Sequence, residues 1–294
     1  MTEASLLCVG NLTIDDLVID GRETTALGGD ALFAALAARR TLTDVRMLAP
    51  MGSDLPSTLL GTVAELGIRV EASRPRTIPT VRNRVEYAAD GSRTWHLLCG
   101  EEAFDVLSVY PEDVAGDALS AEGILVSAMS LRSQLTLGPW LRAQTGATIY
   151  LDLQEDYVVG NERELLDLLA TCDVFLPSEV EAVALAGTTD LERAAEIFRD
   201  AGPDVVVVKT AERGCVIATA DRTVLLPTEA VVPVDSTGAG DAFCGGFAAA
   251  HVAGADPVEA AGAGAAAARV AIGGHGVAGL LADLADRADL GSLA

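Results

Sequence analysis

The sequence predicts an α/β protein whose mostly parallel central sheet is covered by helices on both faces. Short apolar runs alternate with segments of helical length along most of the chain. Strands that alternate with helices in this way form βαβ units, which give parallel strands buried on both sides. The chain has 294 residues, half of them hydrophobic, so we expect one large folded domain over residues 1–294.

The first strand is expected at residues 5–10 and is followed by a helix at 30–40, which is rich in strong helix formers. A strand at 45–49 and a helix at 55–66 come next. Further strands are expected at 123–127, 147–153, 173–176, 204–209 and either 223–227 or 231–234, with helices at 131–144, 162–170, 179–186, 191–201 and 242–253. Alanine-rich helices close the chain.

One region breaks this alternation. Residues 77–99 form two alternating segments around Asp90-Gly91, a pair typical of tight hairpins. Residues 14–20, after the first strand, are also not helical in pattern. These segments, about 12–26 and 77–100, predict a small β lid over one face, since insertions of this kind often carry binding function. A surface hairpin without a function is the alternative.

The net charge of −23 argues against nucleic acid or an anionic membrane as a partner, since both would repel an acidic surface. The apolar runs are too short to span a bilayer, and the N-terminal residues do not read as a secretory signal. Five cysteines occur singly, which indicates reduced and mostly buried thiols. A cytoplasmic location is therefore expected.

The stretch VDSTGAGDAFCGGF, residues 234–247, places a glycine turn at the start of a helix. A helix N-terminus carries partial positive charge and unpaired N–H groups, and glycine at 238 and 240 lets an anion approach them. Asp241 then serves either as a simple N-cap or as a chemical group beside the anion. The stretch is not a P-loop, and it lacks the third glycine of a dinucleotide-binding turn.

The full string closely resembles the C-terminal signature of the ribokinase/PfkB carbohydrate kinase family, D-T-T-G-A-G-D-x-F-x-x-G. This resemblance implies a ribokinase-like three-layer sandwich with a small β-strand lid. It also implies that Asp241 is the base that deprotonates the acceptor hydroxyl. The turn of Gly238, Ala239 and Gly240 is then the anion hole that holds the transferring phosphoryl group.

Near the N-terminus, the residues Gly10 to Asp15 resemble the first strand of that family and the acid that contacts substrate, with Asp16 as the alternative acid. A glycine pair before the first helix resembles the family's G-G-x-x-x-N segment, but Phe33 replaces the asparagine. This departure leaves room for a bulkier or partly apolar substrate, or places Phe33 in the core. The residues implied at the acceptor are Asp15, Gly28, Gly29, Asp30 and Phe33.

The ATP and cation sites are implied in the C-terminal half. Glu181 matches the glutamate of an N-x-x-E motif that organises Mg²⁺, with Ser178 in place of asparagine and a solvated helix carboxylate as the alternative. Asp235 is a candidate ligand for K⁺ or a similar monovalent cation. The nucleotide-binding residues implied are Lys209, Ala211, Gly214, Thr237, Gly240 and Gly274, with Ala211 where glycine is common.

The resemblance implies an ATP- and Mg²⁺-dependent kinase that phosphorylates a hydroxymethyl group of a small sugar or sugar-like alcohol. A nucleoside kinase is the alternative, because Phe33, Tyr87 and Trp95 are aromatic groups able to stack on a base. A sensor of sugars or nucleotides without catalysis is a further alternative, although it would not need Asp241. A homodimer through the lid strands is also expected.

Overall fold

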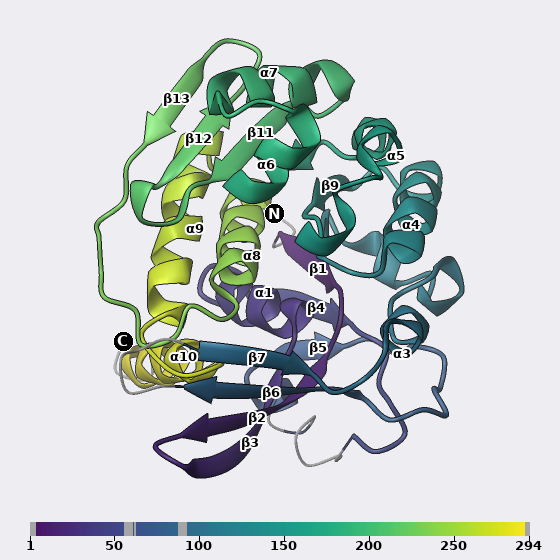
Figure 1. Cartoon of the computed structure of the whole chain (residues 1–294), viewed down its shortest axis with the longest axis vertical. Coiled ribbons are helices and arrows are strands. Elements are labelled where there is room, and N and C mark those ends of the chain that lie inside the picture. Colours follow the sequence, from purple (N-terminus) through teal and green to yellow (C-terminus); the bar gives the residue numbers. More distant parts are fainter. Residues whose placement is uncertain (1–3, 56–60, 62, 88–92, 292–294) are drawn as a thin grey trace.

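The computed structural model describes residues 4–55, 61, 63–87 and 93–291, and within them nine strands form one large sheet (Figure 1). Its strands are β1 (Ser5–Val9), β4 (Asp44–Leu48), β5 (Ile68–Val70), β8 (Gly123–Val126), β9 (Thr148–Leu151), β10 (Val174–Phe175), β11 (Val205–Lys209), β12 (Cys215–Ala218) and β13 (Thr223–Leu226). Their order is β13-β12-β11-β10-β9-β8-β1-β4-β5. All neighbouring strands from β11 to β5 are parallel. Strand β12 pairs antiparallel with both of its neighbours, β11 and β13.

Helices cover both faces of this sheet. One face carries α1 (Asp30–Ala38), α8 (Ala239–Val252), α9 (Pro257–Ala271) and α10 (Ala278–Gly291). The other carries α4 (Leu131–Gln144), α5 (Glu162–Leu168), α6 (Glu179–Ala186) and α7 (Leu191–Ala201). Short 3₁₀ turns lie at η1 (Pro111–Asp113), η2 (Ala118–Ser120), η3 (Glu155–Tyr157), η4 (Leu169–Thr171) and η5 (Ala211–Arg213).

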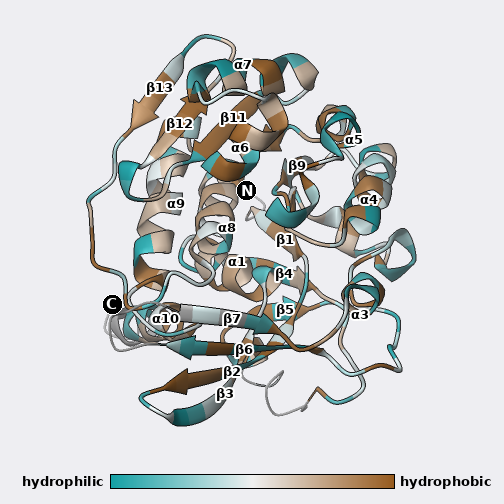
Figure 2. Ribbon diagram, in the orientation of Figure 1, coloured by the Kyte–Doolittle hydropathy of each residue, from teal (hydrophilic) through white to brown (hydrophobic). Residues whose placement is uncertain are grey.

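The side chains of β1 show why two helical layers are needed. Leu6 and Cys8 belong to the core under α1 and α8, whereas Leu7 and Val9 belong to the core on the opposite face. Alternate side chains of a strand point to opposite faces, so a strand that is apolar at every position must be covered twice. Figure 2 shows this pattern, with apolar strands such as β11 between helices that carry hydrophilic residues.

A separate sheet of four described strands lies beside the large one. It contains β2 (Thr13–Ile19), β3 (Arg22–Gly28), β6 (Val81–Tyr87) and β7 (Arg93–Leu97) in the order β3-β2-β6-β7. Strands β2 and β6 are parallel, and each pairs antiparallel with its outer neighbour. The expected hairpin turn at residues 89–92 lies outside the described residues. The short helix α3 (Glu101–Val106) follows β7 and was not predicted.

Most predicted elements are confirmed within four residues at their ends, and the helices at 131–144, 179–186 and 191–201 are confirmed with the predicted ends. Of the two alternatives for the last strand, 223–227 is confirmed and 231–234 is wrong, since Val232 is 94% exposed and belongs to no strand. The helix predicted from residue 242 begins at Ala239. Half of the predicted helix at 55–66 lies outside the described residues, and residues 61 and 63–65 are helical. The described part of the chain contains no helix suited by length and hydropathy to cross a membrane.

Candidate active site

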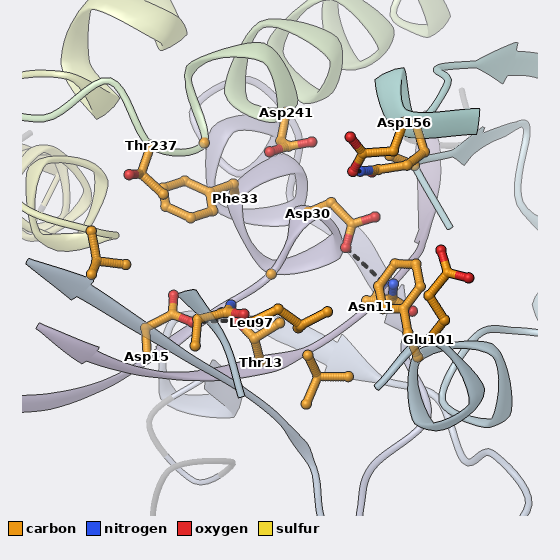
Figure 3. Close-up of a pocket in the computed structure, with 18 of the residues that line it drawn as sticks. Asn11, Thr13, Asp15, Asp30, Phe33, Leu97, Glu101, Asp156, Thr237 and Asp241 are labelled. Atoms are coloured by element: carbon orange, nitrogen blue, oxygen red, sulfur yellow. Dashed lines mark hydrogen bonds between the residues drawn. The ribbon is translucent and has the colours of Figure 1, made fainter. Parts of the chain in front are cut away.

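A cavity of about 310 Å³ opens where the carboxyl ends of the central strands meet the small sheet (Figure 3). Asn11 follows β1, Ala128 follows β8 and Asp156 follows β9, so three parallel strands deliver residues to the same edge. Ligand sites of open α/β sheets lie at this edge because the loops there converge. Val81, Asn83 and other residues of the small sheet close the opposite side.

The glycine turn lies at one wall of this cavity. Gly238 is the N-cap of α8 with a left-handed φ of +70°, and no side chain caps the helix. By contrast, Ser178 caps α6 and Asp256 caps α9 through side-chain oxygens. Asp241 lies in the first turn of α8, so the N-cap alternative for Asp241 is wrong. The N-terminus of α8 is therefore without a capping side chain at the cavity wall.

Asp241 lies beside a buried ion pair whose carboxylate, Asp152, was not among the predicted site residues. The Nζ atom of Lys209, at the end of β11, donates to Oδ1 and Oδ2 of Asp152 at 2.9 and 2.8 Å and to Sγ of Cys244 at 3.2 Å. Burial and the charge of Asp152 raise the pKa of Asp241 to about 6, although Lys209 opposes this shift. Asp241 is thus a carboxylate with increased proton affinity, as a general base near neutral pH requires.

Asp15, on β2, also lines the cavity. Its Oδ1 accepts hydrogen bonds from Thr13 Oγ1 and Asn83 Nδ2, both at 2.8 Å. Burial raises the pKa of Asp15 despite these bonds. A Cβ at Gly28 would lie 1.8 Å from Asp15 Oδ2, so glycine is required at this position for Asp15 to keep its place.

Asp16, the alternative acid, does not line the cavity. Its two carboxylate oxygens each lie 2.7 Å from the guanidinium nitrogens of Arg82, and Oδ1 also accepts from Thr25. The side chains of neighbouring strand residues point to opposite faces, which separates Asp15 from Asp16.

Asp30 begins α1, and its side chain lines the cavity with its carboxylate directed toward Asn11 (Figure 3). Its Oδ1 accepts from the backbone N–H of Asn11 at 2.7 Å, and no hydrogen bond is found for Oδ2 within the described chain. Burial and the neighbouring Asp241 hold the pKa of Asp30 well above its usual value. Gly29, with φ +101°, approaches the carbonyl of Asn11 so closely that a Cβ there would lie 2.4 Å from its oxygen.

Phe33 lines the cavity but is only 2% exposed. Its ring packs against the glycine turn, because a Cβ at Gly238 would lie 2.3 Å from ring atom Cδ1. Phe33 therefore has both of the roles considered for it: it forms part of the cavity wall, and it packs in the core. Tyr87, the second aromatic candidate, packs edge-on against His275 with ring centroids 4.6 Å apart. The side chain of Trp95 lies outside the described part of the structure.

The candidate nucleotide residues lie in three places. Lys209 and Gly240 are neighbours, since a Cβ at Gly240 would lie 3.8 Å from Lys209 Nζ. Ala211 and Gly214 form the turn after β11, and both have positive φ, +50° for Ala211. Gly274 lies between α9 and α10, where a Cβ would lie 2.6 Å from the backbone nitrogen of Gly279.

The two candidate metal ligands are held differently. Glu181 is 6% exposed and forms a capping box with Ser178, so it is not the solvated carboxylate considered as the alternative. Burial and the charge of Asp152 raise the pKa of Glu181 to about 7. In the described residues, no three His, Cys, Asp or Glu side chains cluster as a metal site.

Asp235 accepts hydrogen bonds from at least four donors of the described chain. Its Oδ1 accepts from the N–H and Oγ1 of Thr237 at 2.8 and 2.7 Å, and its Oδ2 accepts from Tyr87 at 2.6 Å and from the N–H of Gly276 at 2.9 Å. Burial alone would raise the pKa of Asp235, but these hydrogen bonds hold it below its usual value. Asp235 thus connects the loop before α8, the small sheet and the turn after α9.

Several residues of the site were missed by sequence reasoning. Asp152, Asn11 and Asn83 come from three separate strands or their ends, far apart in the chain. Asn11 directly follows the predicted strand at 5–10, and Asp152 lies near the end of the predicted strand at 147–153 and directly follows β9. The rule that ligand sites collect at the carboxyl ends of such strands was the signal available for finding them.

Comparison with known proteins places this geometry in a family. Residues 6–283 match the model of the pfkB family carbohydrate kinases. Among curated relatives, cytidine kinase from Thermococcus kodakarensis is 28% identical over 252 residues, which cover 82% of this chain and 86% of the relative. Ribokinase from Haemophilus influenzae is 25% identical over 231 residues, covering 76% and 73% of the two chains.

Solved structures of low identity share the fold. Adenosine kinase from Sinorhizobium meliloti superposes with a TM-score of 0.79 at 21% identity, covering 98% of this chain and all of the other. A probable sugar kinase from Rhizobium etli superposes with a TM-score of 0.80 at 22% identity, covering 99% and 100%. The expected ribokinase-like fold is confirmed, and because the family match extends over residues 6–283, this chain belongs to the pfkB family of carbohydrate kinases.

Proposed function

We propose that this protein transfers the γ-phosphoryl group of ATP to a hydroxymethyl group of a small sugar or sugar-like alcohol. The observation that carries the proposal is the position of Asp241, a carboxylate of raised pKa at the uncapped N-terminus of α8 and on the wall of the cavity. A base beside the backbone N–H groups of a helix N-terminus is what phosphoryl transfer to an alcohol requires.

In this reaction Asp241 accepts the proton of the attacking hydroxyl. The backbone N–H groups of Gly238, Ala239 and Gly240 stabilise the negative charge that develops on the transferring phosphoryl group. Asp15 and Asp30 orient the acceptor, because carboxylate oxygens accept hydrogen bonds from hydroxyl groups. Lys209, beside Gly240 and paired with Asp152, supplies positive charge near the same helix end.

Kinases of this family use ATP, generally with Mg²⁺, and the residues near Asp241 fit such a group. The charge of Asp152 raises the proton affinity of both Glu181 and Asp241, and Lys209 is the cation beside them, so these three carboxylates exceed the positive charge close to them. We propose that Glu181 helps to hold Mg²⁺, which would neutralise charge on the nucleotide phosphates when bound. Since Asp235 already accepts four hydrogen bonds, a role in K⁺ binding would have to involve neighbouring backbone carbonyls.

We further propose that the small sheet acts as a lid that excludes water and so limits ATP hydrolysis. The outer strand β3 is exposed over Arg22–Thr25, which leaves a sheet edge available to a second copy of the chain. A cytoplasmic homodimer joined through these strands is part of the proposal. Sedimentation analysis of the wild-type protein tests it, and a monomer at micromolar concentration would contradict it.

A nucleoside kinase is the second candidate, because named relatives include a cytidine kinase and an adenosine kinase. Purely non-catalytic sensing is less well supported, since a binding protein has no use for a carboxylate of raised pKa at the helix end.

The test is the substitution Asp241→Asn. We expect kcat to fall by about 10²–10⁴-fold while the affinity for ATP is largely kept, because only the proton acceptor is removed. Asp256→Asn is the matched control, since Asp256 caps α9 outside the cavity and asparagine caps equally well. ATP consumption is measured against a panel of sugars, polyols and nucleosides. Near-normal turnover by the Asp241 variant would refute its role as base.

A further inference from the structure

The cavity beside Asp241 has two ends with different chemistry, and the inference drawn from them rests on the proposed kinase function. One end contains Asp15 and Asn83 from the small sheet. The other contains residues of α3 and η3, namely Glu101, Phe104, Asp156 and Tyr157. Figure 3 shows Glu101 and Asp156 on the side of Asn11, away from Asp15 and Thr237.

The charge of the cavity restricts what can enter it. Five of its described lining residues are carboxylic acids, namely Asp15, Asp30, Glu101, Asp156 and Asp241. The described lining includes no Lys, Arg or His. Carboxylates repel an acceptor that already carries a phosphate or a carboxylate, and such acceptors are usually held by Arg or Lys. The cavity therefore favours an uncharged acceptor rich in hydrogen-bond donors.

Two buried amide oxygens indicate where the hydrogen-bond donors of the acceptor molecule would lie. Asn11 and Asn83 are 3% and 7% exposed, and the structure gives the amide oxygen of each no hydrogen-bond partner within its described residues. A buried acceptor without a partner is costly, so these oxygens are suited to ligand hydroxyl groups. Asn83 is at the same time fixed through its Nδ2 to Asp15, so its oxygen is held in place for this task.

The end formed by α3 and η3 is not explained by hydroxyl groups alone. It offers the aromatic side chains of Phe104 and Tyr157 together with the carboxylates of Glu101 and Asp156. Glu101, Asp156 and Tyr157 line the same cavity, where burial raises the pKa of Tyr157 to about 12 and the charges of the two acids add to the shift. Gln154 donates to Asp156 Oδ2 at 3.1 Å and so orients that carboxylate.

Aromatic faces with carboxylate acceptors beside them suit a flat ring that carries N–H donors. We propose that the acceptor is a nucleoside whose base has an exocyclic amino group, as in cytosine and adenine. Its ribose hydroxyls face Asn11, Asp15 and Asn83, and its amino group faces Glu101 and Asp156. Uracil or hypoxanthine would place a carbonyl oxygen against these carboxylates, leaving both acceptors without a donor.

The test is titration calorimetry of wild-type protein with Mg²⁺ and a non-hydrolysable ATP analogue, which measures binding without turnover. Cytidine, adenosine, uridine, inosine, ribose, glucosamine and fructose 6-phosphate are compared. We expect an amino-bearing nucleoside to bind at least about 10-fold more tightly than its carbonyl counterpart, because one hydrogen bond to a charged group provides a difference in affinity of this size. The double variant Glu101→Gln/Asp156→Asn should reduce this preference to about 3-fold or less.

Glu102→Gln is the control, since Glu102 adjoins Glu101 in α3 but does not line the cavity. Equal affinity for cytidine and uridine and for adenosine and inosine, or tighter binding of any of the sugars, would overturn the inference. If an amino-bearing nucleoside binds selectively but the separate assay with ATP itself detects no ATP consumption, the inference holds and the kinase function fails. If ribose alone is bound and phosphorylated, the kinase function holds and the inference fails.

Discussion

The Nζ atom of Lys209 lies 2.8 Å from Oδ2 of Asp152, and this buried pair lies next to Asp241. Removing the lysine leaves the Asp152 carboxylate buried without its cation. Lys209→Met should therefore lower the free energy of unfolding by about 3–5 kcal/mol, measured by urea denaturation. Adding Asp152→Asn to it should recover part of that loss, because the unpaired charge is removed. A double variant less stable than Lys209→Met alone would contradict the importance of the pair.

The pH dependence of turnover follows from the pKa of Asp241. Because that pKa is raised to about 6, the base is protonated below pH 6 and ionised above it. We expect kcat/KM to fall tenfold per pH unit on the acid side of about pH 6 and to level off above it. In Lys209→Met the acid limb should move to higher pH, since Lys209 lowers the pKa of Asp241. An acid limb centred near pH 4 would show that burial leaves Asp241 unperturbed.

Stability should change with pH in the sense opposite to that of turnover. Between pH 3.8 and about 6 the folded protein holds a proton on Asp241 that the unfolded chain has released. The contribution of this group to stability is therefore present at low pH and lost as pH rises through 6. Asp241→Asn should raise the melting temperature at pH 7.5, by about 2–4 °C for each kcal/mol recovered, and leave it unchanged near pH 3.5. A rise of equal size at both pH values would exclude ionisation as the cause.

Sequence reasoning predicted the part of the site whose residues are contiguous. Gly238, Gly240 and Asp241 act within one turn of helix, so their spacing in the chain already fixes their spacing in space. Asn83 and Asp152 could not be predicted in this way. Each comes from its own strand, and only the register of the small sheet brings Asn83 to Asp15, its direct partner on β2.

The errors at element ends have physical causes. The segment at residues 231–234 is rich in valine, which favours a strand, but it pairs with no strand of the described chain, and the N–H of Val234 donates to the carbonyl of Ile272. Propensity alone cannot reveal whether a partner strand is available. Helix α8 starts three residues before the predicted start at residue 242. The preceding loop ends at Gly238, which adopts a left-handed conformation that glycine tolerates at little cost.

The contact between Gly238 and Phe33 gives a prediction about the glycine turn. Gly238→Ala would place a Cβ 2.3 Å from the Phe33 ring, at a φ of +70° that alanine disfavours by about 1–2 kcal/mol. The buried ring cannot retreat, so the turn must move away from its position. We expect kcat to fall by about 10²-fold or more, as when a hydrogen-bond donor to a transition state is lost.

Gly262→Ala is the control for the Gly238 variant. Gly262 lies within α9, and apart from the backbone of that helix no described atom comes within 4 Å of the place that a Cβ would take. Alanine there should leave activity unchanged and stabilise the helix by up to about 1 kcal/mol. Circular dichroism separates misfolding from loss of function. A Gly238→Ala enzyme with wild-type turnover would show that the turn does not need its present shape.

The hydrogen bond from Tyr87 to Asp235 joins the last residue of β6 to the loop before α8. If the small sheet closes over the acceptor, this bond holds it closed, and Tyr87→Phe should raise KM for the acceptor several-fold with a smaller effect on kcat. It should also lower stability by about 0.5–1.5 kcal/mol at neutral pH. Because the pKa of Asp235 is held below its usual 3.8, the stabilisation is present above that pH and is lost as pH falls through the lowered value.

Tyr150→Phe is the matched control for this last variant, because it removes a hydroxyl bonded to His251 at 2.9 Å on a residue that does not line the cavity. It should cost similar stability without a change in KM. Steady-state kinetics and thermal unfolding at pH 7.5 and pH 3 provide the comparison. If the Tyr87 hydrogen bond holds the small sheet closed, KM should rise in Tyr87→Phe and not in Tyr150→Phe. The difference in stability between Tyr87→Phe and wild type should also be smaller at pH 3 than at pH 7.5. An unchanged KM would reduce the bond to an ordinary structural contact.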